Sequence, residues 1–154
     1  MMDELRDLYQ EVILDHGRNP RNFGHPADAT CEARGYNPLC GDQLKVYLKL
    51  DDKGVVQDAA FEGKGCAISV ASASLMTELV KGKTADEARR LFESFHHMAA
   101  GDGEPKPVEG LDDEMERLQV LSGVRDYPVR VKCATLAWHT MTAALKGEQE
   151  ATTE

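Results

Sequence analysis

The chain has 154 residues, of which 42% are hydrophobic and 29% charged, values ordinary for a globular domain with a full core. Its 18 basic and 27 acidic residues give a formal net charge of −9, which argues against binding to nucleic acid or to an anionic membrane. No apolar run is long enough to span a bilayer, and the charged N-terminus lacks the apolar core of a signal peptide. We therefore expect a cytoplasmic protein.

The first part of the chain is predicted to be a helix followed by a small antiparallel sheet. Residues 3–16 carry apolar side chains at helical spacing, and a short strand is predicted near 30–35. Residues 43–50 alternate between apolar and polar side chains, and residues 55–62 return after a hairpin turn. This alternation predicts a sheet with one face open to water.

From residue 67 onward the pattern predicts helices. Residues 67–80 are rich in small side chains, and Thr84-Ala85-Asp86-Glu87 has the form of a capping box that opens the next helix. Residues 99–110 hold three glycines and two prolines and are predicted to be a linker. A further helix is predicted at 111–124, and the last helix is predicted to begin at Cys133.

The elements together predict an α+β fold, in which a small three-stranded antiparallel sheet packs against about five helices. Residues 1–147 are expected to form a single domain, and the polar segment 148–154 is expected to be a disordered tail.

The four cysteines are the first candidates for chemistry. In a cytosolic chain with a full core, as expected here, metal binding or thiol chemistry fits them better than disulfides. Cys40 precedes a strand, Cys66 lies at a strand-to-helix corner and Cys133 at a loop-to-helix corner, so all three can sit at one end of the sheet. The free N–H groups at a helix start favour a thiolate at Cys66. Cys31 has no such setting and is assigned to a strand.

Asp42 follows Cys40 after one glycine, so both side chains can converge on one point. Three thiolates and this carboxylate would complete a tetrahedral zinc site, and thiolates also suit iron–sulfur chemistry. Two alternatives stay open at this point. Cys66 and Cys133 can instead be small buried hydrophobic side chains, and Asp42 can be an ordinary turn or strand-end residue.

Three segments resemble the cysteine motifs of the NifU/IscU-type iron–sulfur assembly family, and the segment 14–24 resembles its opening. The motifs are Asn-Pro-Leu-Cys-Gly-Asp at 37–42, Gly-Lys-Gly-Cys-Ala-Ile-Ser at 63–69 and Arg-Val-Lys-Cys-Ala-Thr-Leu-Ala-Trp at 130–138. The resemblance covers nearly the whole chain. Within the family it points to the SufU branch, because residues near 99–122 look like the SufU insertion and Lys132 replaces the histidine of the IscU branch.

The resemblance implies a SufE/NifU/IscU-like α+β fold and a zinc site whose ligands are Cys40, Asp42, Cys66 and Cys133. It also implies that Cys40 accepts persulfide sulfur from the cysteine desulfurase SufS, and that Arg130 lies close to the site. The protein would then be sulfurtransferase-like rather than a conventional small-molecule enzyme. Its other partners would be iron–sulfur assembly proteins or apo-protein acceptors, with no role for nucleic acid or membranes.

Two other functions remain open on the sequence. The first is a scaffold on which iron is assembled into a [2Fe–2S] cluster, which the missing histidine ligand at Lys132 disfavours. The second is a structural zinc domain that only binds partners. An aspartate ligand argues against it, since structural zinc sites are built from Cys and His.

Overall fold

The computed structural model describes residues 2–100 and 110–152. In chain order the elements are α1 (Met2–Arg18), β1 (Cys31–Asn37), β2 (Asp42–Leu50), β3 (Val56–Lys64), α2 (Ala67–Val80), α3 (Ala85–Ala100), α4 (Asp112–Leu118), the 3-10 helix η1 (Gln119–Asp126), α5 (Pro128–Leu145) and β4 (Glu150–Thr152). The predicted α+β fold is confirmed. Among the described residues, no helix is long and apolar enough to cross a membrane.

The sheet has four strands in the order β3-β2-β1-β4, one more than the three predicted. The first three strands are antiparallel, and β4 pairs in parallel with the outer edge of β1. Residues of β4 belong to the segment expected to be a disordered tail. The chain reverses after α5 at Gly147, whose φ is +78°, and the Arg34 N–H then donates to the Gln149 carbonyl. A strand of three residues is too short to show alternation in the sequence.

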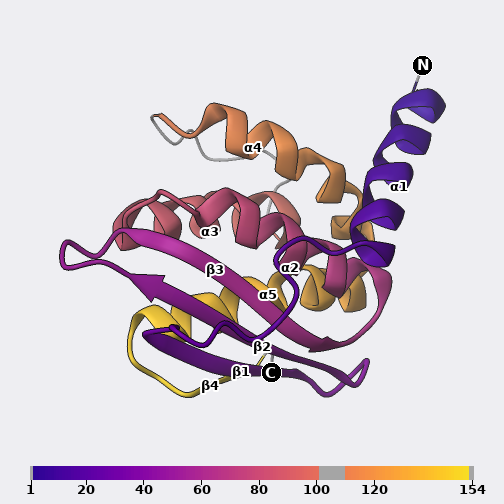
Figure 1. Ribbon diagram of the computed structural model, residues 1–154. Helices are drawn as coiled ribbons and strands as arrows, with labels where there is room; N and C mark the ends of the chain where they lie inside the picture. Colours follow the sequence, from indigo (N-terminus) through magenta and orange to yellow (C-terminus); the bar gives the residue numbers. More distant parts are fainter. Residues whose placement is uncertain (1, 101–109, 153–154) are drawn as a thin grey trace.

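One face of the sheet is covered by helices (Figure 1). Helix α5 packs on β1 and β2, α2 packs on β3, and α3 packs against α5. Trp138 of α5 is fully buried, and its indole N–H donates to the Ser72 hydroxyl of α2 at 3.1 Å. At Gly35 of β1 an added Cβ would overlap the Thr140 hydroxyl, so only glycine lets α5 approach this closely.

The opposite face of the sheet is less open to water than predicted. Tyr47 of β2 is fully buried, because the His25 ring from the preceding loop stacks on it at 4.2 Å. The Tyr47 hydroxyl donates to Glu62, and burial together with this carboxylate raises the pKa of Tyr47. The same loop pairs Phe23 with Phe61, which covers the outer edge of β3. A covering loop of this kind leaves no periodic signal in the sequence.

The helices differ from prediction mainly at their starts. Helix α5 begins at Pro128 rather than at Cys133, because a proline at the first helical position needs no N–H partner. The predicted helix at 111–124 exists as α4 followed by η1, with the expected side chains of Met115, Leu118 and Leu121 buried.

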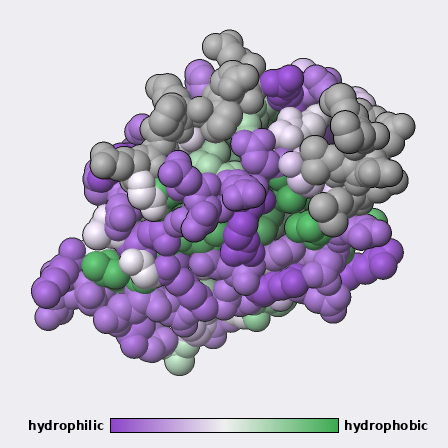
Figure 2. All heavy atoms as spheres, turned by 90° about the horizontal axis from the view of Figure 1, so that it is seen from above, coloured by the Kyte–Doolittle hydropathy of each residue, from purple (hydrophilic) through white to green (hydrophobic). Residues whose placement is uncertain are grey.

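The capping box is confirmed: the Thr84 N–H donates to Glu87, and the Glu87 N–H donates to the Thr84 hydroxyl. Helix α3 extends through Ala100 into the predicted linker, and residues 101–109 of that linker lie outside the described residues. Figure 2 shows the molecule from above, from the side of α4 and the N-terminal end of α1, and the coloured surface there is mostly hydrophilic, with some hydrophobic side chains near its centre. This polar surface agrees with the high content of charged residues.

Candidate metal centre

Three separate segments bring sulfur and carboxylate groups together at one end of the sheet. Cys40 lies in the turn between β1 and β2, Asp42 is the first residue of β2, and Cys133 lies in the second turn of α5. One ligand atom from each of these three residues lies within 4.8 Å of the other two. They form the one group of three or more potential metal ligands at this distance in the described part of the chain.

The Asp42 carboxylate is buried and held at both oxygens. Its Oδ1 accepts the backbone N–H of Cys66 at 2.9 Å, and its Oδ2 accepts the Asn37 side-chain amide at 3.1 Å. The register of β2 and β3, which pairs Gln43 with Lys64, places the start of β2 beside the start of α2. Asp42 therefore orients a carboxylate towards the thiols and also ties the β2 and α2 segments together.

Asp42 can take this position only because residue 65 is a glycine. A Cβ added at Gly65 would lie 2.7 Å from Asp42 Oδ1 and 3.1 Å from its Cγ, which is closer than ordinary contact. The second glycine of the strand-to-helix corner thus makes room for a ligand.

The two thiols nearest each other are those of Cys133 and Cys40. The Cys133 S–H donates to Cys40 Sγ at 3.4 Å, and the Asn37 amide donates to Cys133 Sγ at 3.5 Å. Burial raises the pKa of the Cys133 thiol, and hydrogen bonds from it to its neighbours raise this pKa further. A bound cation reverses this balance, since a coordinating thiol is deprotonated.

Cys66 lies beside this group without belonging to its closest set. It is the N-cap of α2, with extended backbone (φ −69°, ψ 167°), and its side chain forms no cap hydrogen bond. Its thiol is among the neighbours that raise the pKa of Cys133, so the two sulfurs are close. The structure therefore brings Cys40, Asp42 and Cys133 together and places Cys66 at their margin, and the four-ligand set stays a prediction.

The donors present fit a thiophilic metal. Sulfur ligands select zinc or iron–sulfur clusters, and one carboxylate is an accepted fourth ligand for zinc. Cys40 differs from the other two members of the group because it is exposed, whereas Asp42 and Cys133 are buried. Gly41, with φ +73°, allows the tight turn that carries Cys40.

Arg130 is exposed in the first turn of α5, three residues before Cys133. Side chains at this spacing share one face of a helix, so the guanidinium lies on the side of α5 that carries Cys133. Lys132 is half-buried next to the same cysteine.

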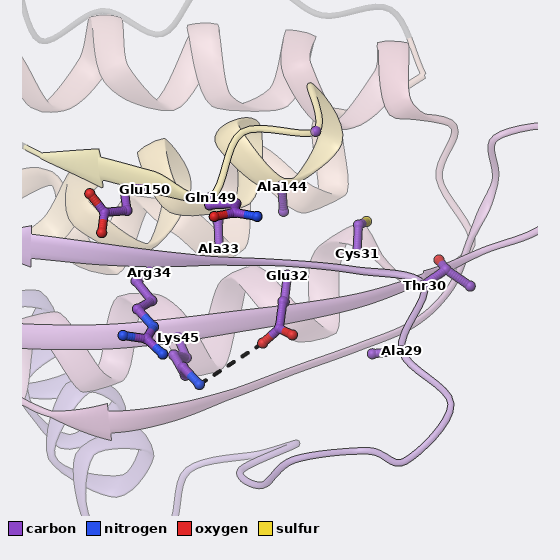
Figure 3. Close-up of a pocket in the computed structure, with 11 residues that line it drawn as sticks. Ala29, Thr30, Cys31, Glu32, Ala33, Arg34, Lys45, Ala144, Gln149 and Glu150 are labelled. Carbon is purple, nitrogen blue, oxygen red and sulfur yellow. Dashed lines mark ion pairs between the residues drawn. The ribbon is translucent and has the colours of Figure 1, made fainter.

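Cys31 lies far from this group, in the strand predicted for it. It begins β1, and six residues of extended chain place it about 20 Å from the Asn37 end of the strand. It lines a separate cavity of about 640 Å³ at the outer edge of β1, together with Arg34, Glu150 and others (Figure 3). An ion pair between Lys45 and Glu32, 4.0 Å long, lies across this cavity.

The histidines have structural contacts. His96 lies against His139 and Phe92 at ring-centroid distances of 5.8 and 5.7 Å. His16 is buried, and its Nδ1 is hydrogen-bonded to the Ser74 hydroxyl at 2.7 Å.

Two residues of the centre were not predicted from the sequence. Asn37 contacts both Asp42 and Cys133, although it lies within the first cysteine motif and could have been singled out there. Gly65 lies within the second cysteine motif, but its contact with Asp42 depends on the pairing of β2 with β3 and has no local signal in the sequence.

A family model described as the NifU-like N terminal domain matches residues 8–134. The zinc-dependent sulfurtransferase SufU of Bacillus subtilis is 40% identical over 147 residues, covering 94% of each chain. The iron–sulfur cluster assembly scaffold protein IscU of Thermotoga maritima is 42% identical over 140 residues, covering 90% of this chain and 93% of that one.

A crystal structure of the N-terminal part of a nitrogen-fixing NifU-like protein from Brucella abortus has the same fold. It matches with a TM-score of 0.80 at 31% identity, covering 93% of this chain and 95% of the other. The three cysteine motifs, the arrangement of sheet and helices and these matches agree, and the chain belongs to the NifU/IscU-like family of iron–sulfur cluster assembly proteins.

Proposed function

We propose that this protein is a zinc-dependent sulfur acceptor in iron–sulfur cluster assembly, as expected for the SufU branch. Cys40 would receive sulfane sulfur from the persulfide of a cysteine desulfurase of the SufS type. The observation that carries the proposal is the contrast within the centre: Cys40 is exposed, while Asp42 and Cys133 are buried. An exposed sulfur beside fixed, buried ligands can meet a partner without unfolding the site.

Zinc would be held by Cys40, Asp42, Cys66 and Cys133. When bound, it keeps the coordinating sulfur as a thiolate near neutral pH without a separate base. Asn37 would hold the Asp42 carboxylate in place, because its amide already donates to Oδ2.

The transfer is a thiol–persulfide exchange. The Cys40 thiolate attacks the outer sulfur of the donor persulfide, a new S–S bond forms at Cys40, and the donor's S–S bond breaks. The donor cysteine leaves as a thiolate, so no external oxidant or reductant is needed. We assign Arg130 the role of holding the anionic sulfur during this exchange, since its guanidinium is exposed one helical turn from Cys133.

Exposed apolar side chains near the centre support a protein partner. Leu39 precedes Cys40 and is 62% exposed, and Tyr127 and Val129 at the start of α5 are 64% and 48% exposed. Such residues are typical of interaction surfaces. The free thiols of all four cysteines support a reducing compartment, and we propose that transfer takes place in the cytosol.

The test combines metal analysis with desulfurase turnover. We expect the purified protein to bind about one zinc ion tightly and to stimulate cysteine desulfurase. The Cys40→Ala variant should lose this stimulation, and the matched control Cys31→Ala should keep it, because Cys31 lies at the far end of β1. Full stimulation by Cys40→Ala would refute the sulfur-acceptor role.

The second candidate is a scaffold for a [2Fe–2S] cluster, favoured by the relatives that are named IscU scaffold proteins. The same cysteines would then hold iron rather than accept sulfur. Anaerobic reconstitution with iron and sulfide distinguishes the two functions. A stable coloured cluster that is passed to an apo-protein supports the scaffold, and tightly bound zinc with Cys40-dependent stimulation supports transfer.

A further inference from the structure

One buried hydroxyl near the centre has no hydrogen-bond partner. Ser69 is fully buried in the first turn of α2, and its Oγ is the one buried side-chain nitrogen or oxygen atom without a partner among the described residues. Buried polar groups are nearly always hydrogen-bonded, and leaving one unsatisfied is unfavourable. This hydroxyl therefore needs an explanation that the packing of α2 does not supply.

Ser69 and the Asp42 ligand both lie beside Gly65. A Cβ at Gly65 would be 2.7 Å from Asp42 Oδ1 and 3.2 Å from Ser69 Cβ, so both side chains border the same point. Ser69 also follows Cys66 by three residues, and side chains at this spacing share one face of a helix. Its side chain thus lies in the neighbourhood of two residues of the proposed metal centre, Asp42 and Cys66.

The third helical position commonly carries a polar side chain that accepts the N–H of the N-cap residue. Here that function is taken by Asp42, whose Oδ1 accepts the Cys66 N–H at 2.9 Å. Ser69 is left with a free donor, and a carboxylate oxygen has a second lone pair that can accept it.

We infer that Ser69 is a positioning residue of the metal centre, whose hydroxyl donates to the Asp42 carboxylate when the metal is bound. The inference rests on the proposed zinc centre. A hydrogen bond to a ligating carboxylate fixes its orientation, and losing such a partner typically lowers metal affinity by about 10- to 100-fold. Without that hydrogen bond the buried hydroxyl gives no stabilisation, so its removal should not lower the stability of the metal-free protein.

The test is Ser69→Ala, with Ser72→Ala as the matched control on the same helix. Zinc affinity is measured by competition with a chromophoric chelator, cobalt binding by visible absorption, and stability by thermal melting of the metal-free proteins. Ser69→Ala should bind zinc about 10- to 100-fold more weakly, with an altered cobalt spectrum and no loss of metal-free stability.

The control should behave in the opposite way. The Ser72 hydroxyl donates to the Ala134 carbonyl and accepts the Trp138 indole N–H, so its loss should lower the melting temperature and leave zinc affinity unchanged. If Ser69→Ala bound zinc with wild-type affinity, the positioning role of Ser69 would be wrong and the proposed zinc centre would stand. Failure of the wild-type protein to bind zinc would overturn the metal centre and the inference with it.

Discussion

Replacing Gly65 by alanine tests the geometry of the metal centre most directly. The new Cβ would lie 2.7 Å from Asp42 Oδ1, whereas ordinary contact begins at 3.4 Å. The carboxylate must therefore move by several tenths of an ångström, which disturbs the hydrogen bond that the Cys66 backbone N–H donates to the same oxygen at 2.9 Å. The expected result is a displaced ligand in an otherwise folded protein.

The size of the effect follows from that hydrogen bond. A hydrogen bond to a charged acceptor contributes about 1.5–3 kcal/mol, and each 1.4 kcal/mol changes an equilibrium constant about tenfold. Zinc affinity of Gly65→Ala should therefore fall by about 10- to 100-fold. The backbone at Gly65 has no positive φ, so alanine adds no strain of its own.

Chelator competition gives the zinc affinity, and circular dichroism of the metal-free variant shows that it is folded. Gly123→Ala is the control, because no atom lies within 4 Å of its added Cβ. If Gly65→Ala bound zinc as tightly as the control, Asp42 would not be a ligand in this position.

Two further predictions concern the fold. Gly35→Ala should lower the free energy of unfolding by about 1–3 kcal/mol, because its Cβ would overlap the Thr140 hydroxyl. Chemical denaturation measures this change, and wild-type stability would contradict the close approach of α5 to β1. Burial lowers the pKa of His16, whose Nδ1 is hydrogen-bonded to the Ser74 hydroxyl, so its contribution to stability is complete above the unfolded pKa of about 6.5 and is lost as the pH falls below it. His16→Gln should flatten the dependence of stability on pH between about 7 and 5; an unchanged slope would mean that other groups cause it.

The sequence by itself determined the local elements and the chemistry available. Alternation in β2, the capping box at the start of α3 and the small residues of α2 each depend on neighbours in the chain, and each was predicted correctly. The cysteine motifs likewise point to the family by themselves, because their residue types and order are properties of the chain alone.

Tertiary structure decided how those residues meet. The contacts of Asn37 with Cys133, and of Gly65 with Asp42, join segments separated in the chain and depend on strand register and on the path of α5. The same holds for β4 and for the burial of Tyr47 under the loop that carries His25. Local sequence patterns do not predict such long-range contacts, because these contacts form, and contribute to stability, only when the folded chain brings the distant residues together.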